Sequence, residues 1–295
     1  MRYLAARAAI LRAVRAFFVE QGYLEVETPV RLPAIIPERY IEPEESSGWF
    51  LQTSPELCMK RLLAAGHGKI FQICKCFRRS ERGSLHLPEF TMLEWYRAGG
   101  DYRDLMAECA AMLCFVAAHL DFPLPPSTRL LVNERDWEHL TVARAFALHA
   151  PVSLEEALRR DIFDEILVQY IEPHLGREKP TFLHDYPAQL GALACLKKDD
   201  PSLAERFELY IHGIELANGF SELTDAVEQQ QRFVKEQALI VLQGRHPGPM
   251  PEKFLADLPA IESAAGIALG VDRLVMLLCG ATSIDEVVCF SPETL

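Results

Sequence analysis

The sequence predicts an α+β protein in which a mainly antiparallel sheet is flanked by helices. Helical and extended segments follow one another without the regular alternation of a doubly wound sheet, and residues 207–220 have the pattern of a β-hairpin. The 295 residues, 49% hydrophobic and 24% charged, suffice for one large domain or for one domain with a helical insertion. We therefore expect a single domain over residues 1–295.

The first elements are predicted from apolar spacing and from helix punctuation. Residues 4–20 carry apolar groups at helical intervals, and the glycine at 22 ends that helix. Residues 22–30 alternate as a short extended segment, and a polar loop rich in Pro and Glu covers 33–48. Residues 54–63 predict a helix that opens with Ser54 as N-cap and a proline in its first turn.

The middle of the chain predicts two strands, a long helix and an insertion. Residues 69–77 and 89–97 read as strands that a charged loop joins. Residues 101–120 repeat apolar groups at helical spacing. Residues 121–180 predict an insertion of short helices.

The last third of the chain predicts the hairpin at residues 207–220, two helices and two further strands. Residues 181–186 read as a strand, and His212-Gly213 has the character of a two-residue turn inside the hairpin. Asp225 and Glu228 are placed as a capping box for a helix that runs to about 242. Residues 263–280 predict a glycine-punctuated strand that leads into a helix.

Charge and hydropathy exclude some classes of partner. The net charge is −12, from 42 acidic and 30 basic residues, which is the opposite of what a protein gripping long nucleic acid by its phosphates carries. This argues against tRNA as the main partner, although a local basic patch for one folded RNA or for an acidic protein stays open. Arginines are spread through the first 18 residues, so this segment predicts an amphipathic helix and not a signal peptide. We expect no membrane association.

The eight cysteines indicate a reducing compartment. None forms a C-x-x-C pair, and most have apolar neighbours, as reduced core cysteines do. Cys74 and Cys76 form a possible ligand pair, but a strand that places both on one face accounts for them better, because the second half of a zinc signature is missing. The sequence therefore predicts a cytoplasmic protein.

A charged loop at residues 78–89 is the first candidate site. Arg78, Arg79, Arg82 and His86 crowd one turn region. Activation of a carboxylate by ATP requires cations where charge builds on the α-phosphate, and an arginine at a strand end supplies them with bidentate geometry. Taken alone, however, a solvated hairpin loop of mixed charge accounts for these residues better.

Three glutamates around the hairpin form the second candidate site. Glu208, Glu215 and Glu222 recur at intervals of seven. A carboxylate among buried strand residues requires a partner, because an unpaired buried charge is costly. Mg²⁺ that bridges ATP phosphates, a substrate ammonium and cross-strand salt bridges to arginine all satisfy this requirement, and all three stay open.

Two further groups are ambiguous by themselves. Glu94 and Tyr96 alternate onto one face of a strand, which suits either an alkylammonium or a structural hydrogen bond. Glu56 also complements a helix dipole. The glycines at 266 and 270 precede Arg273, but their spacing is neither the dinucleotide-binding nor the Walker pattern and is more typical of tight packing.

Together these segments resemble the three signature motifs of class II aminoacyl-tRNA synthetases, in the right order. Residues 22–29 resemble motif 1, 76–96 motif 2 and 268–277 motif 3. Residues 53–63 and 213–226 are most similar to the lysine-specific branch. The resemblance covers nearly the whole chain apart from parts of 120–175. It implies the class II catalytic fold, use of ATP and Mg²⁺, and a homodimer built on motif 1.

The resemblance also implies a particular acceptor. The catalytic domain begins almost at the first residue, so we expect no anticodon-binding domain. The chain is thereby similar to freestanding paralogues of lysyl-tRNA synthetase that attach (R)-β-lysine to elongation factor P, and Ala268 stands where lysyl-tRNA synthetases have glycine. The alternatives are an enzyme that activates α-lysine for tRNA or another acceptor, and a catalytically inactive regulatory module.

The resemblance assigns roles residue by residue. Arg78 and Arg273 are the catalytic cations at the α- and γ-phosphates, and Glu208 and Glu215 hold Mg²⁺. The family's adenine-facing Glu and Asn are replaced by Ser80 and Leu87 in this sequence. The expected amino-acid pocket contains Ser54, Pro55, Glu56, Glu94, Tyr96, Glu222 and Ala268. The expected ATP site contains Arg78, Arg79, Ser80, His86, Leu87, Phe90, Glu215, Leu216, Gly270 and Arg273.

Overall fold

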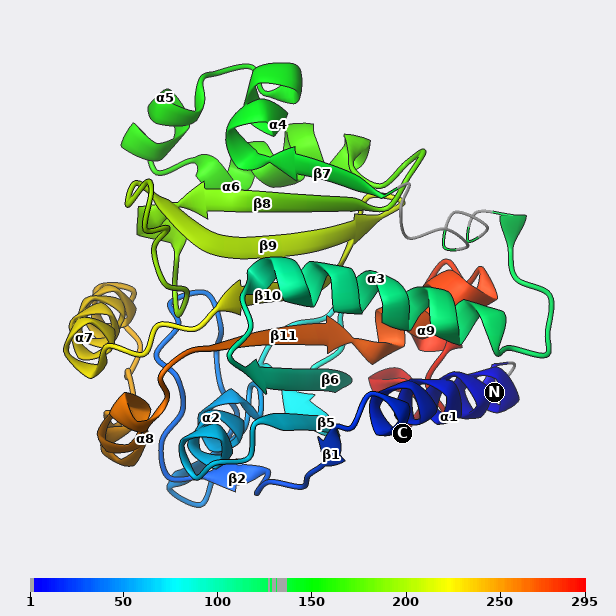
Figure 1. Ribbon diagram of the computed structural model, residues 1–295, viewed down its shortest axis with the longest axis horizontal. Coiled ribbons are helices and arrows are strands. Elements are labelled where there is room, and N and C mark those ends of the chain that lie inside the picture. The colour runs from blue at the N-terminus through cyan, green and yellow to red at the C-terminus, as the bar shows by residue number, and fades with distance from the viewer. Residues whose placement is uncertain (1–2, 127, 129–130, 132–136) are drawn as a thin grey trace.

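A single large sheet runs through the computed structural model, which describes residues 3–126, 128, 131 and 137–295 (Figure 1). Its eight strands have the order β1-β5-β6-β11-β10-β9-β8-β7, and only the outer pairs β1–β5 and β7–β8 are parallel. The predicted α+β fold with a mainly antiparallel sheet is confirmed. In chain order the strands are β1 (Leu24–Glu25), β5 (Lys69–Phe77), β6 (Glu89–Ala98), β7 (Glu138–Thr141), β8 (Thr181–Pro187), β9 (Leu203–Ile211), β10 (Ile214–Ser221) and β11 (Ala264–Gly270).

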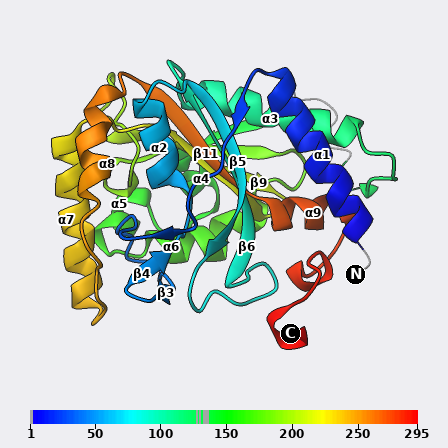
Figure 2. The same ribbon diagram turned by 90° about the horizontal axis from the view of Figure 1, so that it is seen from below.

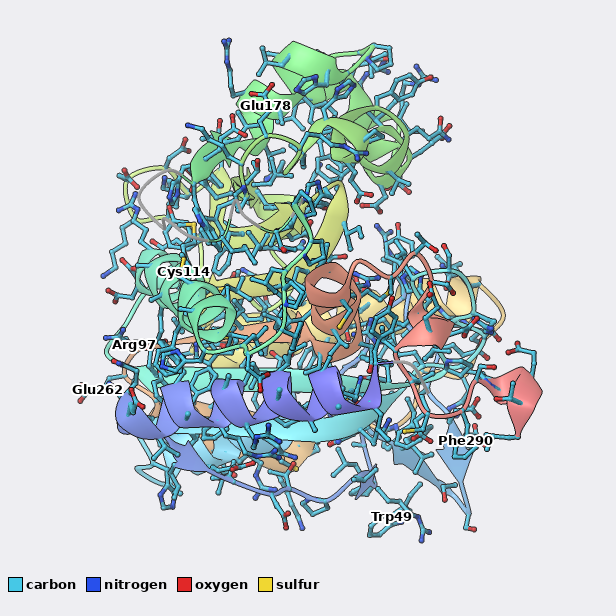
Figure 3. The ribbon with its side chains drawn as sticks, turned by 90° about the vertical axis from the view of Figure 1, so that its right-hand side faces the viewer. Trp49, Arg97, Cys114, Glu178, Glu262 and Phe290 are labelled. Atoms are coloured by element: carbon cyan, nitrogen blue, oxygen red, sulfur yellow. The ribbon has the colours of Figure 1, made fainter. Side chains whose placement is uncertain are left out.

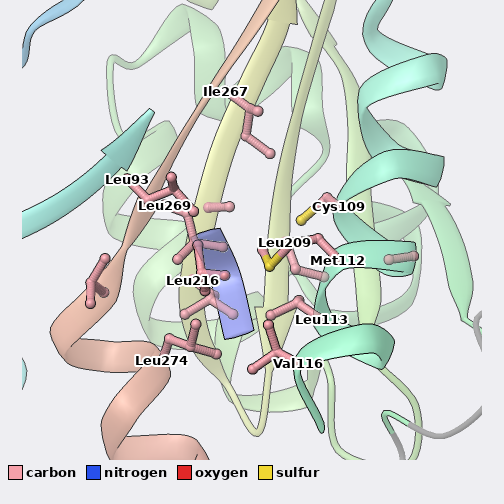
Figure 4. Packing of buried hydrophobic residues seen from close by; sticks show 14 of the residues in the cluster. Leu93, Cys109, Met112, Leu113, Val116, Leu209, Leu216, Ile267, Leu269 and Leu274 are labelled. Carbon is pink, nitrogen blue, oxygen red and sulfur yellow. The ribbon is translucent and has the colours of Figure 1, made fainter. Parts of the chain in front are cut away.

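Three helices cover one face of the sheet and enclose the main core. They are α1 (Leu4–Glu20), α3 (Tyr102–Ala118) and α9 (Val271–Cys279), and α1 packs along α3 (Figure 1). Figure 4 shows strand residues such as Leu93, Leu209 and Leu269 meeting helix residues such as Met112 and Leu274. Because side chains alternate along a strand, the neighbours of these core residues point to the opposite face.

The opposite face is covered near the β7 edge by a third group of helices, described below, and at one end of β5, β6 and β11. The helices α2 (Glu56–Ala64), α7 (Ala226–Leu242) and α8 (Glu252–Asp257) gather there, with α7 and α8 side by side (Figure 2). Their apolar residues pack on Ile70, Tyr96 and Ala264, which lie at the same end of three adjacent strands. The remaining part of this face is not covered by any of the described helices.

A third group of helices packs on the β7 edge of the sheet. These are α4 (Val142–His149), α5 (Leu154–Arg159) and α6 (Phe163–Ile166), with a core that includes Phe146 and Leu183. The short helices predicted within 121–180 are present, but the segment also contains β7, which joins the sheet and which the sequence did not predict; a strand of four residues is too short to show a clear period of two. Residues 127, 129–130 and 132–136 of this segment lie outside the described residues. Short π- or 3₁₀-helical turns occur at Leu167–Ile171, Glu172–His174, Ala188–Leu190, Leu258–Ala260, Ile284–Glu286 and Pro292–Thr294.

Two predicted helix starts need correction. Helix α2 begins at Glu56 with Pro55 in the N-cap position, so Ser54 lies one residue further out, and its hydroxyl accepts from the Glu56 N–H at 3.3 Å. Asp225 caps α7 as predicted, by accepting from the second and third N–H groups of the helix. The reciprocal half of the predicted capping box is wrong, because Glu228 pairs with Arg232 at 2.5 Å instead.

The predicted hairpin and a smaller sheet complete the fold. His212 (φ +57°) and Gly213 (φ +76°) both adopt the left-handed conformation of a type I′ turn, which confirms the two-residue loop between β9 and β10. The strands β2 (Arg31–Leu32), β3 (Glu45–Ser46) and β4 (Trp49–Leu51) form a separate three-stranded sheet. Figure 3 shows Trp49, 46% exposed, at the edge of the molecule.

In the part of the chain that the structure describes, no helix combines the length and the apolar character that crossing a membrane requires.

Candidate active site

A cavity of about 310 Å³ lies over the uncovered part of the sheet. Its floor is built from residues that are neighbours across four strands: Glu94 of β6 pairs with Ala268 of β11, which pairs with Asn218 of β10. Asn218 in turn pairs with Glu208 of β9. Because paired residues share a face, antiparallel pairing brings together side chains that are more than a hundred positions apart in the sequence.

One end of the cavity is cationic. The Arg78 guanidinium lies 5.1 Å from the centre of the Phe90 ring, and its nearest carboxylate, Glu81, is 3.8 Å away. The buried Nε of Arg78 has no hydrogen-bond partner within the described residues. A buried donor without an acceptor is costly, so this nitrogen is suited to an anionic ligand.

Arg273 forms the second cation at this end. Its guanidinium donates to the Glu215 carbonyl oxygen at 2.6 Å and to Nε2 of His86 at 2.7 Å. Burial, together with the charge of Arg273, lowers the pKa of His86, so the imidazole is neutral and accepts this hydrogen bond.

The position of Arg273 is fixed through the preceding residue. Asp272 forms a 2.6 Å ion pair with Arg7 of α1 and accepts from the Thr91 N–H of β6 at 2.7 Å. The start of α9 is thereby joined to both the first helix and the sheet. Arg273 is thus positioned relative to the floor of the cavity.

The other end is anionic and has a buried ion triad. Lys60 of α2 is 1% exposed, and its ammonium contacts Glu56 and lies 2.5 Å from Oε2 of Glu222. Burial alone would lower the pKa of Lys60, but the two carboxylates raise it above its usual value, so the side chain stays charged. The Oε1 atom of Glu222 is buried without a hydrogen-bond partner among the described residues.

Tyr96 and Gly266 shape the space around this triad. The Tyr96 hydroxyl donates to Glu94 at 2.9 Å, and burial, followed by the charge of Glu56, raises the pKa of Glu94 well above its usual range. At Gly266 a Cβ would overlap the Tyr96 ring and lie 2.5 Å from Oε1 of Glu222. The tight packing that the sequence suggested for Gly266 is confirmed. The absence of a side chain at this position leaves room for the side chains of Tyr96 and Glu222.

The Glu208 and Glu215 carboxylates share one face of the sheet, as a cation site requires. Glu208 accepts from the hydroxyls of Tyr186 and Tyr210, both at 2.6 Å, and from Arg206 at 2.7 Å. Burial and the neighbouring charge of Glu208 raise the pKa of Glu215. A bound cation would offset the repulsion between these two carboxylates. No described group of three or more His, Cys, Asp and Glu residues is arranged to hold a metal by itself. The donor set fits Mg²⁺ that substrate phosphates also hold.

The structure brings most of the predicted residues together but not all. On the cavity wall lie Ser54, Glu56, Arg78, His86, Leu87, Phe90, Glu94, Glu215, Leu216, Ala268, Gly270 and Arg273. Tyr96 and Glu208 lie just beneath the wall, in contact with its residues, and Glu222 is linked to the wall residue Glu56 through Lys60. Pro55 is buried at the start of α2, and Arg79 is 56% exposed and 3.5 Å from Glu42. Ser80 is exposed at φ +64°, and Glu81, not Ser80, faces the cavity.

Four polar or charged side chains are among the residues of the site that sequence reasoning missed. Glu38, Arg206 and Asn218 line the wall, and Lys60 lies beneath it. The spacing of Lys60 four residues after Glu56 was an available signal for an ion pair on one helix face. The alternation of Arg206 with Glu208 placed them on one face of a strand. Glu38 lies in an irregular loop that has no period from which to place it.

Comparison with known proteins agrees with the predicted fold. The family of class II tRNA synthetases (D, K and N) matches residues 1–294. Curated proteins called elongation factor P–(R)-β-lysine ligase, from Salmonella paratyphi B, Salmonella schwarzengrund and Salmonella choleraesuis, are 42% identical to the chain, with 97% of the chain and 94% of each relative covered. The chain belongs to the class II tRNA synthetase family, in its D, K and N group.

Proposed function

We propose that this enzyme activates (R)-β-lysine with ATP and transfers the acyl group to a lysine side chain of elongation factor P. The observation that carries the proposal is the cavity with two unlike ends. Among the described residues, Arg78 has a buried donor without a partner at one end, and Glu222, beneath the wall at the other end, has a buried acceptor without one. A diamino acid whose carboxylate is being joined to a phosphate presents the complementary charges. The name of the relatives supports the choice of amino acid and acceptor.

The charges at the anionic end suit two ammonium groups. Glu56, Glu94 and Glu222, when ionised, carry three negative charges, of which Lys60 offsets one. Both amines of a lysine isomer can then be received without leaving a buried charge unpaired. Ser54, Tyr96 and Ala268 complete this proposed pocket, with Pro55 fixing the start of α2.

The phosphates and the base of ATP, which acts as a co-substrate, belong at the cationic end. In the first step a substrate carboxylate oxygen attacks the α-phosphorus, and pyrophosphate leaves. Arg78 stabilises the charge on the α-phosphate and Arg273 that on the γ-phosphate, while Phe90 stacks on adenine. His86, Leu87, Leu216 and Gly270 complete the proposed site, with Arg79 and Ser80 on the loop beside it.

Mg²⁺ is proposed to be held by Glu215 and Glu208 together with phosphate oxygens, where it would neutralise phosphate charge. In the second step the acceptor amine attacks the acyl carbon of the adenylate, and AMP leaves. No side-chain nucleophile is needed, because catalysis consists of positioning and charge stabilisation.

The remaining partners rest on the same proposal. We propose a homodimer, on the resemblance of residues 22–29 to motif 1. The net charge of −12 argues against tRNA as the acceptor. A translation factor as acceptor places the reaction in the cytoplasm.

One experiment separates the proposed function from its alternatives. Pyrophosphate exchange is measured with (R)-β-lysine and with α-lysine, followed by mass analysis of added elongation factor P and tRNA. We expect exchange with (R)-β-lysine and a mass increase on elongation factor P alone. Labelled tRNA with unmodified elongation factor P would favour a synthetase of α-lysine. Absence of exchange with both amino acids would favour an inactive module.

The methyl group of Ala268 is expected to set the choice between lysine isomers. Ala268 lies on the cavity floor directly across from Glu94. Ala268→Gly is expected to shift the kcat/KM ratio toward α-lysine by about tenfold, because one methyl group in a packed pocket is worth roughly 1–3 kcal/mol. The ratio is measured by exchange with each isomer. An unchanged ratio would contradict this role.

The affinity for the amino acid is expected to rise with pH. Burial raises the pKa of Glu222 to about 8, and a substrate ammonium binds the ionised form of this carboxylate. Since raising the pH ionises Glu222, KM should fall between pH 6.5 and 8 and level off above, by up to about tenfold per unit of pH. Glu222→Gln should give a high KM without this slope. A flat KM profile for the unaltered enzyme would contradict the assignment.

A further inference from the structure

The loop between β2 and β3 brings a carboxylate, Glu38, onto the cavity wall. Hydrogen bonds hold both backbone groups of the next residue, Arg39. The Arg39 N–H donates to Glu236 of α7 at 2.9 Å, and Arg245 donates to the Arg39 carbonyl. Further along the loop, the Glu42 carbonyl accepts from the Arg79 N–H at 2.7 Å. Glu38 is thereby held beside the start of the motif 2 loop.

Charged groups from four elements face Glu38. Glu56 of α2 and Glu236 of α7 are acidic, and Arg206 of β9 and Arg78 at the end of β5 are basic. Glu38 is partly buried, and no described residue donates a hydrogen bond to its carboxylate or forms an ion pair with it. Because it shares its surroundings with both Glu56 and Arg78, it lies where the amino-acid end of the cavity meets the phosphate end.

Glu38 differs in this respect from the other carboxylates of the described wall. Each of the others already has a partner, in the pairs Glu56 with Lys60, Glu81 with Arg78, Glu94 with Tyr96, Glu215 with Arg273, and Asp272 with Arg7. One carboxylate is thus left uncommitted on the wall, near both Glu56 and Arg78.

The transfer step requires such a group. An acceptor lysine arrives as an ammonium ion, which has no lone pair and cannot attack a carbonyl carbon. A base must remove a proton first, and an effective base has a pKa near the working pH. Arg78 and Arg273 are cations and His86 accepts from Arg273, so these three side chains are not available for this task.

We propose that Glu38 receives the ammonium group of the acceptor lysine and takes its proton in the transfer step. This inference rests on the proposed function. The proton moves from the lysine Nζ to a Glu38 oxygen, and the freed electron pair forms the amide C–N bond. The acyl C–O bond to the phosphate then breaks. The second proton of the attacking nitrogen leaves with the phosphate oxygen of AMP.

The electrostatic surroundings of Glu38 suit a base. Burial, which is the largest effect, and the charges of Glu56 and Glu236 raise its pKa to about 7, while Arg78 and Arg206 act in the opposite direction. The carboxylate is ionised, and therefore active, above this value, and it is protonated and inactive below it. The transfer rate should thus rise with pH through about 7 and then level off.

The test measures the two steps separately on the full chain. Glu38→Gln should leave pyrophosphate exchange with (R)-β-lysine within about threefold of the unaltered enzyme, because the first step needs no base at this position. Single-turnover transfer from preformed adenylate to elongation factor P should fall about 10²-fold, the usual contribution of a general base. The inflection of the transfer rate near pH 7 should disappear, whereas Glu38→Asp should keep part of the rate.

Glu45→Gln is the matched control, because Glu45 lies on the exposed strand that ends the same loop. It should leave both steps unchanged. If Glu38→Gln lost exchange and transfer equally, or transferred at the full rate, the role of Glu38 would be overturned, but the proposed function would not. Failure of the unaltered enzyme to exchange would overturn the proposed function, and this role with it.

Discussion

Arg78→Ala is expected to lower kcat/KM for adenylate formation by about 10³-fold, the upper range for loss of one preorganised charge-stabilising donor. The guanidinium lies over Phe90, and its Nε has no acceptor within the described residues. An anion that develops at this position would therefore meet a donor already in place. Pyrophosphate exchange at varied amino acid and ATP concentrations measures the loss. Arg78→Lys should recover only part of it, because lysine lacks the bidentate fork.

Arg82→Ala supplies the matched control. Arg82 belongs to the same loop but pairs with Glu293 at 2.8 Å and with Asp285 at 2.9 Å near the C-terminus. These exposed pairs contribute little, so exchange should stay within about threefold. Equal losses in both variants would show that the loop's overall charge matters and not the position of Arg78.

Lys60→Met is expected to damage both stability and amino-acid binding. Removal of one partner from a buried ion group costs about 3–5 kcal/mol, because the carboxylates left behind lack compensation. Glu56 and Glu222 would then repel each other and take up protons, so KM for the amino acid should rise about 10–100-fold, as for the loss of a charged hydrogen bond. Urea unfolding measures the first effect and pyrophosphate exchange the second.

A double variant distinguishes charge balance from simple loss of packing. Lys60→Met with Glu222→Gln should regain part of the unfolding free energy, since one uncompensated charge is gone, but should not regain amino-acid activation. Lys75→Met is the control, because Lys75 forms an exposed 3.4 Å pair with Glu89 and should cost less than about 1 kcal/mol. Full stability of Lys60→Met would contradict the buried triad.

The fold was predictable where the signals are local. A type I′ turn needs two residues that tolerate positive φ, and His212-Gly213 shows this in the sequence itself. The strands β5 and β6 have runs of nine and ten residues, long enough for a pattern to appear. The four-residue β7 owes its place to pairing with β8, which no local pattern records.

The motifs predicted which segments form the site, but not which of their side chains face the cavity. Ser80 occupies the position at which the family has a glutamate, but a positive φ there turns the chain so that Glu81 faces the cavity. Lys60 and Glu222 are 162 positions apart and meet only because α2 packs on β5 and β6, within reach of the residue that follows β10. Such pairs depend on tertiary contacts, and so does the uncommitted state of Glu38.

The anchoring of both chain ends beside the cavity bears on how the enzyme should be handled. Arg7 holds the aspartate next to Arg273, and Glu293 holds Arg82 of the motif 2 loop. A tag or truncation that disturbs Arg7 therefore acts next to a catalytic group, whereas loss of the exposed Glu293 pair should have only the small effect expected for Arg82→Ala. Kinetic constants should be compared between tagged and tag-free enzyme before any substitution is interpreted.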